Sequence, residues 1–378
     1  MLRSALPSYL AKGLVITLLA GTSTQAQQEQ QPEDTSWYQQ IQVNGFGSAA
    51  YTYNANSPSS KLNGFRIFDD RANHLNGDVA ELVVQRAIAK PNQLGFRVDV
   101  TAGNSIPLKT KAAGMDWGRS LDLQQALLSY IAPLGSGLKL DAGKFVTPLG
   151  MEIIEGYDGY NDQYSRSLLF NYAIPLTHTG LRATYPISSV ATLSGMVVQG
   201  WDNVKDNNSR KSGGVTLALV PATDVSVALN YLAGPEQAGN TSALRQVFDV
   251  VAIWKLTKIY SLGANYDYGT EAEASQLRAG GRASWRGFAG YGKVEGIGPL
   301  QIALRAEQFD DMDGARLGLT QSTRLREITL TPAYRVTHNL LIRAEFRHDR
   351  ANTALFETST AAPVRRQSTV GLNALVVF

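Results

Sequence analysis

The stretch Leu340–His348 reads LLIRAEFRH and alternates strictly between two kinds of side chain. Its apolar set comprises Leu340, Ile342, Ala344 and Phe346, and its largely charged set comprises Leu341, Arg343, Glu345 and Arg347. Successive side chains of a β-strand point to opposite faces, so a period of two predicts a strand with one apolar and one charged face.

The same alternation recurs along the chain, for example in Leu94–Thr101, Tyr260–Tyr268 and Ile302–Glu307. A soluble β-sandwich would bury the apolar face and a membrane barrel would expose it to lipid, so alternation alone does not separate the two. The overall fractions of charged and hydrophobic residues, 18% and 44%, do not separate the two either. More telling are the 35 Gly, which suit bends and tight turns, and the 16 Tyr and 12 Phe, which suit the two membrane interfaces.

The lengths of the connections separate these alternatives. Short connections are predicted at 90–92, 133–136, 186–189, 221–223, 256–258, 295–299 and 335–337. They alternate with longer polar loops near 54–78, 104–118, 147–175, 202–212, 234–244, 270–282, 310–322 and 349–366. Short periplasmic turns opposite long extracellular loops are typical of outer-membrane barrels. We therefore predict an all-β fold, a transmembrane antiparallel up-and-down β-barrel of about 16 strands with both termini periplasmic. Glycines blur the pattern in Gln276–Lys293, so strand boundaries stay open there.

The N-terminus has the pattern of a secretory signal peptide. Arg3 and Lys12 precede the apolar stretch 13–21, and small residues lead up to Ala26. This apolar stretch is well short of the ~20 residues that a spanning helix needs. We expect a signal peptide over 1–26, a flexible polar periplasmic leader over 27–40, and the barrel over 41–378.

The C-terminal strand carries a second targeting feature. Val370, Leu372, Ala374, Val376 and the terminal Phe378 fall on one face. This ending resembles the C-terminal signal that the bacterial barrel assembly machinery recognises. It predicts that Phe378 is an assembly signal, that the protein lies in the cell outer membrane, and that its partners are the assembly machinery and outer-membrane lipids.

Several segments resemble one family. They are GFRIFDD at 64–70, DVAELVVQR at 78–86, QALLSYIAP at 125–133, DAGKFVTPLGME at 141–152, YSRSLLFNY at 164–172 and PLTHTG at 175–180. In these segments the chain resembles the β-barrel porins of Gram-negative bacteria described as OmpL-like, most densely from Gly45 to about Tyr185. The resemblance implies a water-filled outer-membrane channel for passive diffusion of small polar or charged solutes, and it transfers no catalytic residue.

Charged residues on the polar strand faces are candidates for lining the pore. They are Arg97, Asp99, Arg305, Glu307, Arg343, Glu345 and Arg347. In a water-filled lumen such charges would stay solvated without a buried partner and would act on a passing ion. The alternative is that they brace the wall in cross-strand pairs.

The loop from Thr147 to Pro175 is the more specific candidate. It is the third long loop, and in general porins that loop folds into the barrel and narrows the pore. It carries Glu152, Glu155, Asp158, Asp162 and Arg166. We expect it to form the pore constriction, whereas the alternative is an external loop over the mouth.

Other chemistries have weaker support. The four histidines, His74, His178, His338 and His348, lack ligand spacing, and Asp310, Asp311 and Asp313 lack the closing Glu of a calcium loop, so we expect no metal and no cofactor. A net charge of +3 without a basic run gives no reason to expect nucleic acid. An outer-membrane lipase or protease is one rival function, but no G-x-S-x-G occurs. A surface adhesin is another, and whether the barrels form homotrimers is left open.

Overall fold

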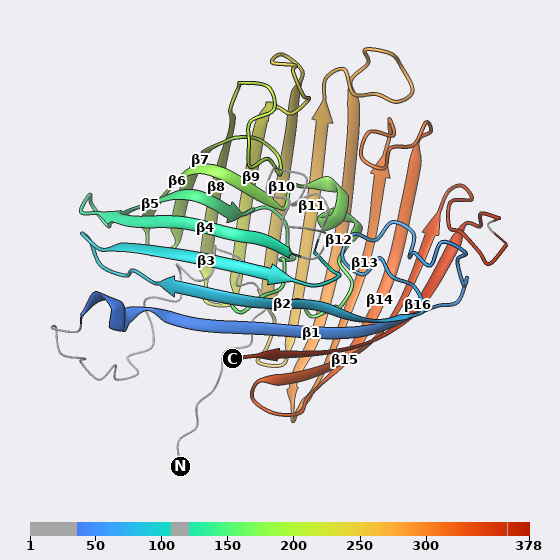
Figure 1. Cartoon of the computed structure of the whole chain (residues 1–378), viewed down its shortest axis with the longest axis horizontal. Coiled ribbons are helices and arrows are strands. Elements are labelled where there is room, and N and C mark those ends of the chain that lie inside the picture. Colours follow the sequence, from blue (N-terminus) through green and yellow to red (C-terminus); the bar gives the residue numbers. More distant parts are fainter. Residues whose placement is uncertain (1–35, 107–120, 361) are drawn as a thin grey trace.

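The computed structural model describes residues 36–106, 121–360 and 362–378 of the chain. Within these residues, sixteen strands form one closed antiparallel barrel (Figure 1). The strands are β1 (Gln42–Asn54), β2 (His74–Arg86), β3 (Leu94–Ala102), β4 (Leu121–Ala132), β5 (Leu138–Val146), β6 (Thr177–Ser188), β7 (Ala191–Val198), β8 (Ser212–Ala222), β9 (Val225–Pro235), β10 (Leu244–Lys255), β11 (Tyr260–Glu271), β12 (Ala283–Ile297), β13 (Leu300–Asp311), β14 (Thr323–Arg335), β15 (Leu340–Ala351) and β16 (Arg366–Val377).

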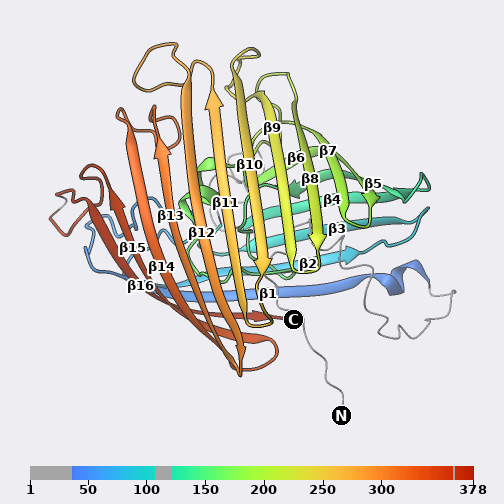
Figure 2. The same ribbon diagram turned by 180° about the vertical axis from the view of Figure 1, so that it is seen from behind.

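Each strand pairs with its neighbours in sequence, and β1 pairs with β16 to close the ring. At the seam, Phe46 lies opposite Val377, and the backbone of Phe378 exchanges two hydrogen bonds with Gly45. Figures 1 and 2 show that β1 to β4 cross β10 to β14 at a steep angle, as tilted strands on opposite walls of a barrel do. The predicted strand number and up-and-down order are confirmed, and the blurred region resolves into β12 after a loop over 272–282.

The barrel is polar inside and apolar outside. On β15, the Ile342 and Phe346 residues are 38% and 47% exposed, whereas Arg343 and Arg347 are fully buried. Large apolar residues are exposed in the same way on other strands, among them Leu181, Val197, Phe288, Leu304, Ile328 and Leu372. A soluble β-sandwich would show the reverse distribution, so this outer surface matches a lipid environment.

The long loop between β5 and β6, residues 147–176, lies inside the barrel, and we name it L3. It contains a single π-helical turn, η3 (Leu169–Ala173), which packs against β11 and β12. A short 3-10 turn, η2 (Trp37–Gln40), precedes β1. The predicted signal peptide and residues 27–35 of the predicted leader lie outside the described residues.

No helix in the described part of the chain is both long and apolar enough to cross a membrane.

The alternation of long loops and short turns gives a testable orientation. Asn207 is exposed in a long loop, and Ala222 is exposed at a short turn on the opposite rim. Single cysteines at these positions, in a chain that has 0 Cys, should differ on intact cells: an impermeant thiol reagent should label position 207 only. Labelling of position 222 alone would invert the barrel in the membrane.

The seam predicts a role for the last residue. The ring of Phe378 lies over Gly45, where an added Cβ would meet its Cζ at 2.4 Å. Deleting Phe378 should remove this contact and two backbone hydrogen bonds of about 1 kcal/mol each, and should reduce the amount of folded barrel. Heat-modifiable gel mobility measures this, and Phe378→Tyr is the matched control that keeps an aromatic end. Equal yields of the deletion and the control would argue against an assembly role.

Candidate functional site

L3 enters the lumen through a sharp turn at Gly150. Its φ of +89° lies in a region that favours glycine, and an added Cβ would lie 2.5 Å from Cδ1 of Ile174. Beyond the turn, the Gly150 N–H donates to Asp249 on β10 at 3.1 Å, and the Met151 N–H donates to Asn265 on β11 at 3.2 Å. The loop that leaves β5 therefore docks on strands far along the barrel wall.

Two carboxylates of L3 form buried ion pairs with wall arginines. Glu152 lies 2.6 Å from Nη1 of Arg305 on β13. Glu155 accepts from both Nη atoms of Arg343 on β15, at 2.7 and 3.2 Å, and also lies 3.3 Å from Nη2 of Arg166 in L3 itself. All of these side chains are at most 5% exposed. Forked, charge-assisted contacts of this kind fix the position of the loop.

The other two carboxylates of L3 differ in their access to water. Asp162 lies 3.2 Å from Nζ of Lys293 on β12, with its side chain only 10% exposed. Asp158 lies 2.5 Å from Arg97 on β3, which also holds Asp99 at 2.7 Å, and the Asp158 side chain is 45% exposed. Of the four, Asp158 is thus the carboxylate whose side chain is most accessible to water.

Charged wall residues also bind the backbone of L3. Glu345 accepts the N–H of Tyr164 at 2.7 Å, and Glu307 accepts that of Leu168 at 2.6 Å. Arg347 donates to a loop carbonyl at 2.6 Å. Arg305, Arg343 and Arg347 point inward as expected from the alternation, but they are fully buried beneath L3. The expectation that these arginines stay solvated without a buried partner is therefore wrong.

Two loop carboxyls have shifted pKa values. Burial would raise the pKa of the Glu155 carboxyl, but Arg166 and Arg343 outweigh it and hold that pKa below its ordinary value. Burial raises the pKa of the Asp162 carboxyl above its ordinary value, although Lys293 opposes the shift. Ionised Glu155 therefore stabilises the docked loop at neutral pH, and this contribution is lost only as the pH falls through its lowered pKa.

The second half of L3 docks through apolar contacts. Leu168, Leu169, Phe170, Ile174 and Leu176 join a buried hydrophobic cluster with wall residues that include Trp285 and Phe309. The indole N–H of Trp285 donates to the carbonyl of Ala173 at 3.0 Å, which satisfies a backbone group of η3. An apolar core inside a barrel excludes water from that part of the lumen.

A second loop, L1 (residues 55–73), also folds inward. Its Arg66 is buried between Asp69 and Asp349, at 2.5 and 2.7 Å. Its Phe68 packs beside Phe170 of L3, with ring centroids 5.8 Å apart. The alternation pattern does not mark these residues as part of the site, although they lie in GFRIFDD, one of the family-like segments.

A β-bulge places two further carboxylates on the lumen face. Along β2, Val79 pairs with Ser48 and Gly77 with Ala49, so Asp78 is an extra residue. This insertion turns both Asp78 and Glu81 inward, although their spacing would put them on opposite faces of a regular strand. A strict period of two therefore missed them, and the signal in the sequence was its local break at DVAE.

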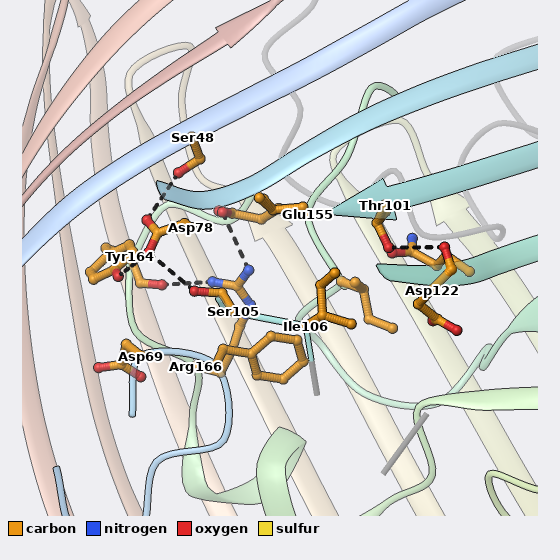
Figure 3. A pocket seen from close by; sticks show the side chains of 14 residues that line it. Ser48, Asp69, Asp78, Thr101, Ser105, Ile106, Asp122, Glu155, Tyr164 and Arg166 are labelled. Carbon is orange, nitrogen blue, oxygen red and sulfur yellow. Dashed lines mark hydrogen bonds and ion pairs between the residues drawn. The ribbon is translucent and has the colours of Figure 1, made fainter. Parts of the chain in front are cut away.

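A small cavity of about 30 Å³ lies between L1, L3 and the wall from β1 to β4 (Figure 3). Four carboxylates line it, and three of them pair with a base: Asp69 with Arg66, Asp122 with Lys144, and Glu155 with Arg166. The fourth, Asp78, accepts instead from the hydroxyls of Ser48, Ser105 and Tyr164. The volume corresponds to one or two water molecules.

The remaining candidates take part in local structure. The His178 ring is buried, and its two nitrogens are hydrogen-bonded to the carbonyl of Gly200 and to Oγ1 of Thr147. Asp310 pairs with Arg286 and Arg324, whose side chains are about half exposed. Asp311 accepts from the N–H of Arg316 in the loop that follows β13, and Asp313 accepts from the N–H of Ser284 on β12. In the described ranges, no group of three or more His, Cys, Asp or Glu could hold a metal.

Solved structures similar to this one are outer-membrane channels. The anion-selective porin from Comamonas acidovorans superposes with a TM-score of 0.60 at 11% identity, over 89% of this chain and 99% of that chain. The channel DcaP of Acinetobacter baumannii and the Salmonella typhi OmpF complex with daunomycin each give a TM-score of 0.59. They share 11% and 12% identity, over 89% of this chain and 97% of each of theirs. At such identities the likeness shows the fold.

The family match comes from the sequence. No curated protein matches the chain. The family model described as "Putative beta-barrel porin-2, OmpL-like" matches residues 40–378. The resemblance noted above was densest over the first half of the barrel, whereas the match covers all of it. The chain therefore belongs to the beta-barrel porin-2, OmpL-like family, and it is an outer-membrane porin.

Proposed function

We propose that this porin is a weakly selective diffusion channel whose narrowest part lies between L3 and the β3 wall, beside Asp158 and Arg97. The observation that carries the proposal is the exposure of Asp158, which is 45%, whereas Glu152, Glu155 and Asp162 are 3 to 10% exposed in their ion pairs. An ion in the lumen would then pass Asp158 while the other three carboxylates hold the loop in place.

The pairing of charges supports weak rather than strict selectivity. Each carboxylate of L3 lies within 4 Å of a Lys or Arg, so the fields of the pairs largely cancel at a distance. Close to the passage, the opposed Asp158 and Arg97 leave a transverse field. Such a field favours small polar or zwitterionic solutes that align with it.

Planar-bilayer recording in a salt gradient tests this proposal. Wild-type channels should give a small reversal potential. Asp158→Asn should shift it towards anions, because Arg97 then faces the passage with only Asp99 as a counter-charge, and the single-channel conductance should stay similar.

Asp206→Asn is the matched control, since Asp206 lies in an external loop and pairs there with Lys211. It should leave the reversal potential unchanged. Equal shifts in both variants, or none in Asp158→Asn, would mean that ions do not pass beside Asp158.

We further propose that the protein has no enzymatic activity and assembles as a homotrimer. The family and the fold support a channel rather than a catalytic barrel. OmpT of Vibrio cholerae, which superposes with a TM-score of 0.54 at 10% identity, has been solved in a trimer form. The mass of the detergent-purified complex by light scattering tests the trimer, and lipase and protease assays on the same sample test for catalysis.

A further inference from the structure

Two buried carboxylates face each other beneath the first arm of L3, which we define as residues Gly150 to Glu152. Asp249 on β10 and Asp267 on β11 are directly opposite in the strand register, and both are fully buried. Directly opposite residues of neighbouring antiparallel strands have Cβ atoms about 4.5–5.5 Å apart, so the two carboxyl groups lie side by side. Neither has a Lys or Arg within 4 Å in the described part of the chain, so no base neutralises this pair.

The donors around the pair all serve Asp249. It accepts from the Gly150 N–H at 3.1 Å, from Asn230 Nδ2 at 2.6 Å and from Asn265 Nδ2 at 2.7 Å. Among the described residues, no donor reaches either carboxylate oxygen of Asp267. A carboxylate that accepts three hydrogen bonds is well suited to be ionised, whereas an ionised carboxylate with none in a buried place is strongly disfavoured.

The surroundings add negative rather than positive charge. On β9 the neighbour is the neutral Asn230, on β11 it is Asn265, and from β13 the carboxylate of Glu307 acts on Asp267. L3 contributes the backbone N–H of Gly150 to this pair, whereas the N–H of Met151 donates to Asn265. Two ionised carboxylates in contact here would repel each other without compensation.

We propose that Asp249 and Asp267 form a proton-binding site that holds one proton, carried by Asp267 and donated to Asp249, and that this proton keeps the first arm of L3 docked. The proton removes the repulsion between the two carboxylates. It also gives Asp267 a hydrogen bond, because the protonated carboxyl donates to Asp249. Asp249 stays ionised and free to bind the N–H of Gly150.

The site couples pH to the position of L3. When the pair loses its proton to lumen water at alkaline pH, two negative charges are left side by side, and Asp249 turns away from Asp267 and from Gly150. The first arm of L3, from Gly150 to Glu152, then loses its contact with β10. This consequence rests on the proposed function, since it requires L3 to limit the conductance.

Infrared spectroscopy of the purified barrel tests the proton directly. At neutral pH, wild type should show a protonated-carboxyl band that is absent in Asp267→Asn, because the amide supplies the hydrogen bond without an ionisable proton. Asp224→Asn, at an exposed turn, is the matched control and should keep the band. Identical spectra for wild type and Asp267→Asn would overturn the proposal, whether or not L3 limits the conductance.

Bilayer recording across pH tests the coupling through an asymmetry between the two sites. Wild type should change from a low, quiet conductance to a larger, noisier one as the pH rises. Asp267→Asn should stay in the low state at every pH, because its amide replaces the acid. Asp249→Asn should be noisy at every pH. Its amide has one acceptor oxygen where the carboxylate has two, so it cannot accept from all three donors and from the Asp267 acid as well.

Two outcomes would overturn the coupling. One is an alkaline step in Asp267→Asn equal to that of wild type. The other concerns recordings at constant pH in which N-methylglucamine replaces Na⁺. If this exchange of cations switched the channel between its two conductance states, the pair would hold a metal ion instead of a proton. If the infrared band is present but no variant changes the conductance, the proton site stands, and the role of L3 in limiting the conductance fails.

Discussion

Neutralising all four L3 carboxylates, in the variant Glu152→Gln, Glu155→Gln, Asp158→Asn and Asp162→Asn, should shift the reversal potential strongly towards anions. The change leaves Arg305, Arg343, Arg97 and Lys293 without their loop partners. A unit charge 4 Å from a passing ion contributes about 1 kcal/mol in water and about 4 kcal/mol near a protein surface. Removing four negative charges from one lumen should therefore change the anion-to-cation permeability ratio many-fold, and most of the change should come from Asp158, whose side chain is 45% exposed. Bilayer recording in a salt gradient measures this ratio.

The rim of the barrel offers the control for this variant. At the rim with the long loops, Asp310 and Asp313 pair with Arg324 and Arg278, which are 47% and 69% exposed, so water and salt screen these pairs. Asp311 accepts there from the N–H groups of Arg316 and Leu317. Neutralising these three should barely move the reversal potential. If both sets behaved alike, the four loop carboxylates would have no special access to the ion path. Heat-modifiable mobility shows that each variant is folded before it is compared.

Replacing Arg343 should have the largest effect on stability. Arg343 connects its own strand β15 with two other segments: its guanidinium donates to Glu155 and the carbonyl of Asn161 in L3, and to Asn373 on β16. In Arg343→Met, Glu155 stays buried without this partner, and breaking a buried pair in this way costs about 3 to 5 kcal/mol. Urea unfolding of the barrel in detergent should show the loss, and bilayer traces should show a larger, noisier conductance as L3 detaches.

A double variant separates the lost pair from the lost volume. In Arg343→Met with Glu155→Gln, the carboxylate that lost Arg343 is itself removed, so part of the stability should return. The return should be incomplete, because Glu155→Gln also takes away the ion-pair partner of the buried Arg166. Arg350→Met is the matched control, because Arg350 lies on the same strand but is exposed. If the double variant were no more stable than Arg343→Met alone, the buried ion pair would not be what holds the loop.

The strands and their order could be predicted because each carries its own signal. In LLIRAEFRH the period of two marks both the strand and its two faces, and the alternation of short and long connections separates a membrane barrel from a soluble sandwich. Such patterns are local, since the pleat of a strand turns every second side chain to the same face. The acidic loop over 147–175 was also visible, because its charges and its length stand out from the strands on either side.

The partners and the burial of each inward charge depend on the tertiary structure. The period of two places Arg305, Arg343 and Arg347 on the inner face, but nothing local shows that L3 covers them and removes them from water. The bulge that turns Asp78 and Glu81 inward depends on the register between β1 and β2. The contact of Asp249 with Asp267 likewise depends on the register between β10 and β11. Where the strand pairing is regular, the face that a side chain takes follows from the backbone of one strand, so the sequence alone predicts it. The burial and partner of each charge depend on segments far apart in the chain, so only the closed barrel with its inserted loop decided them.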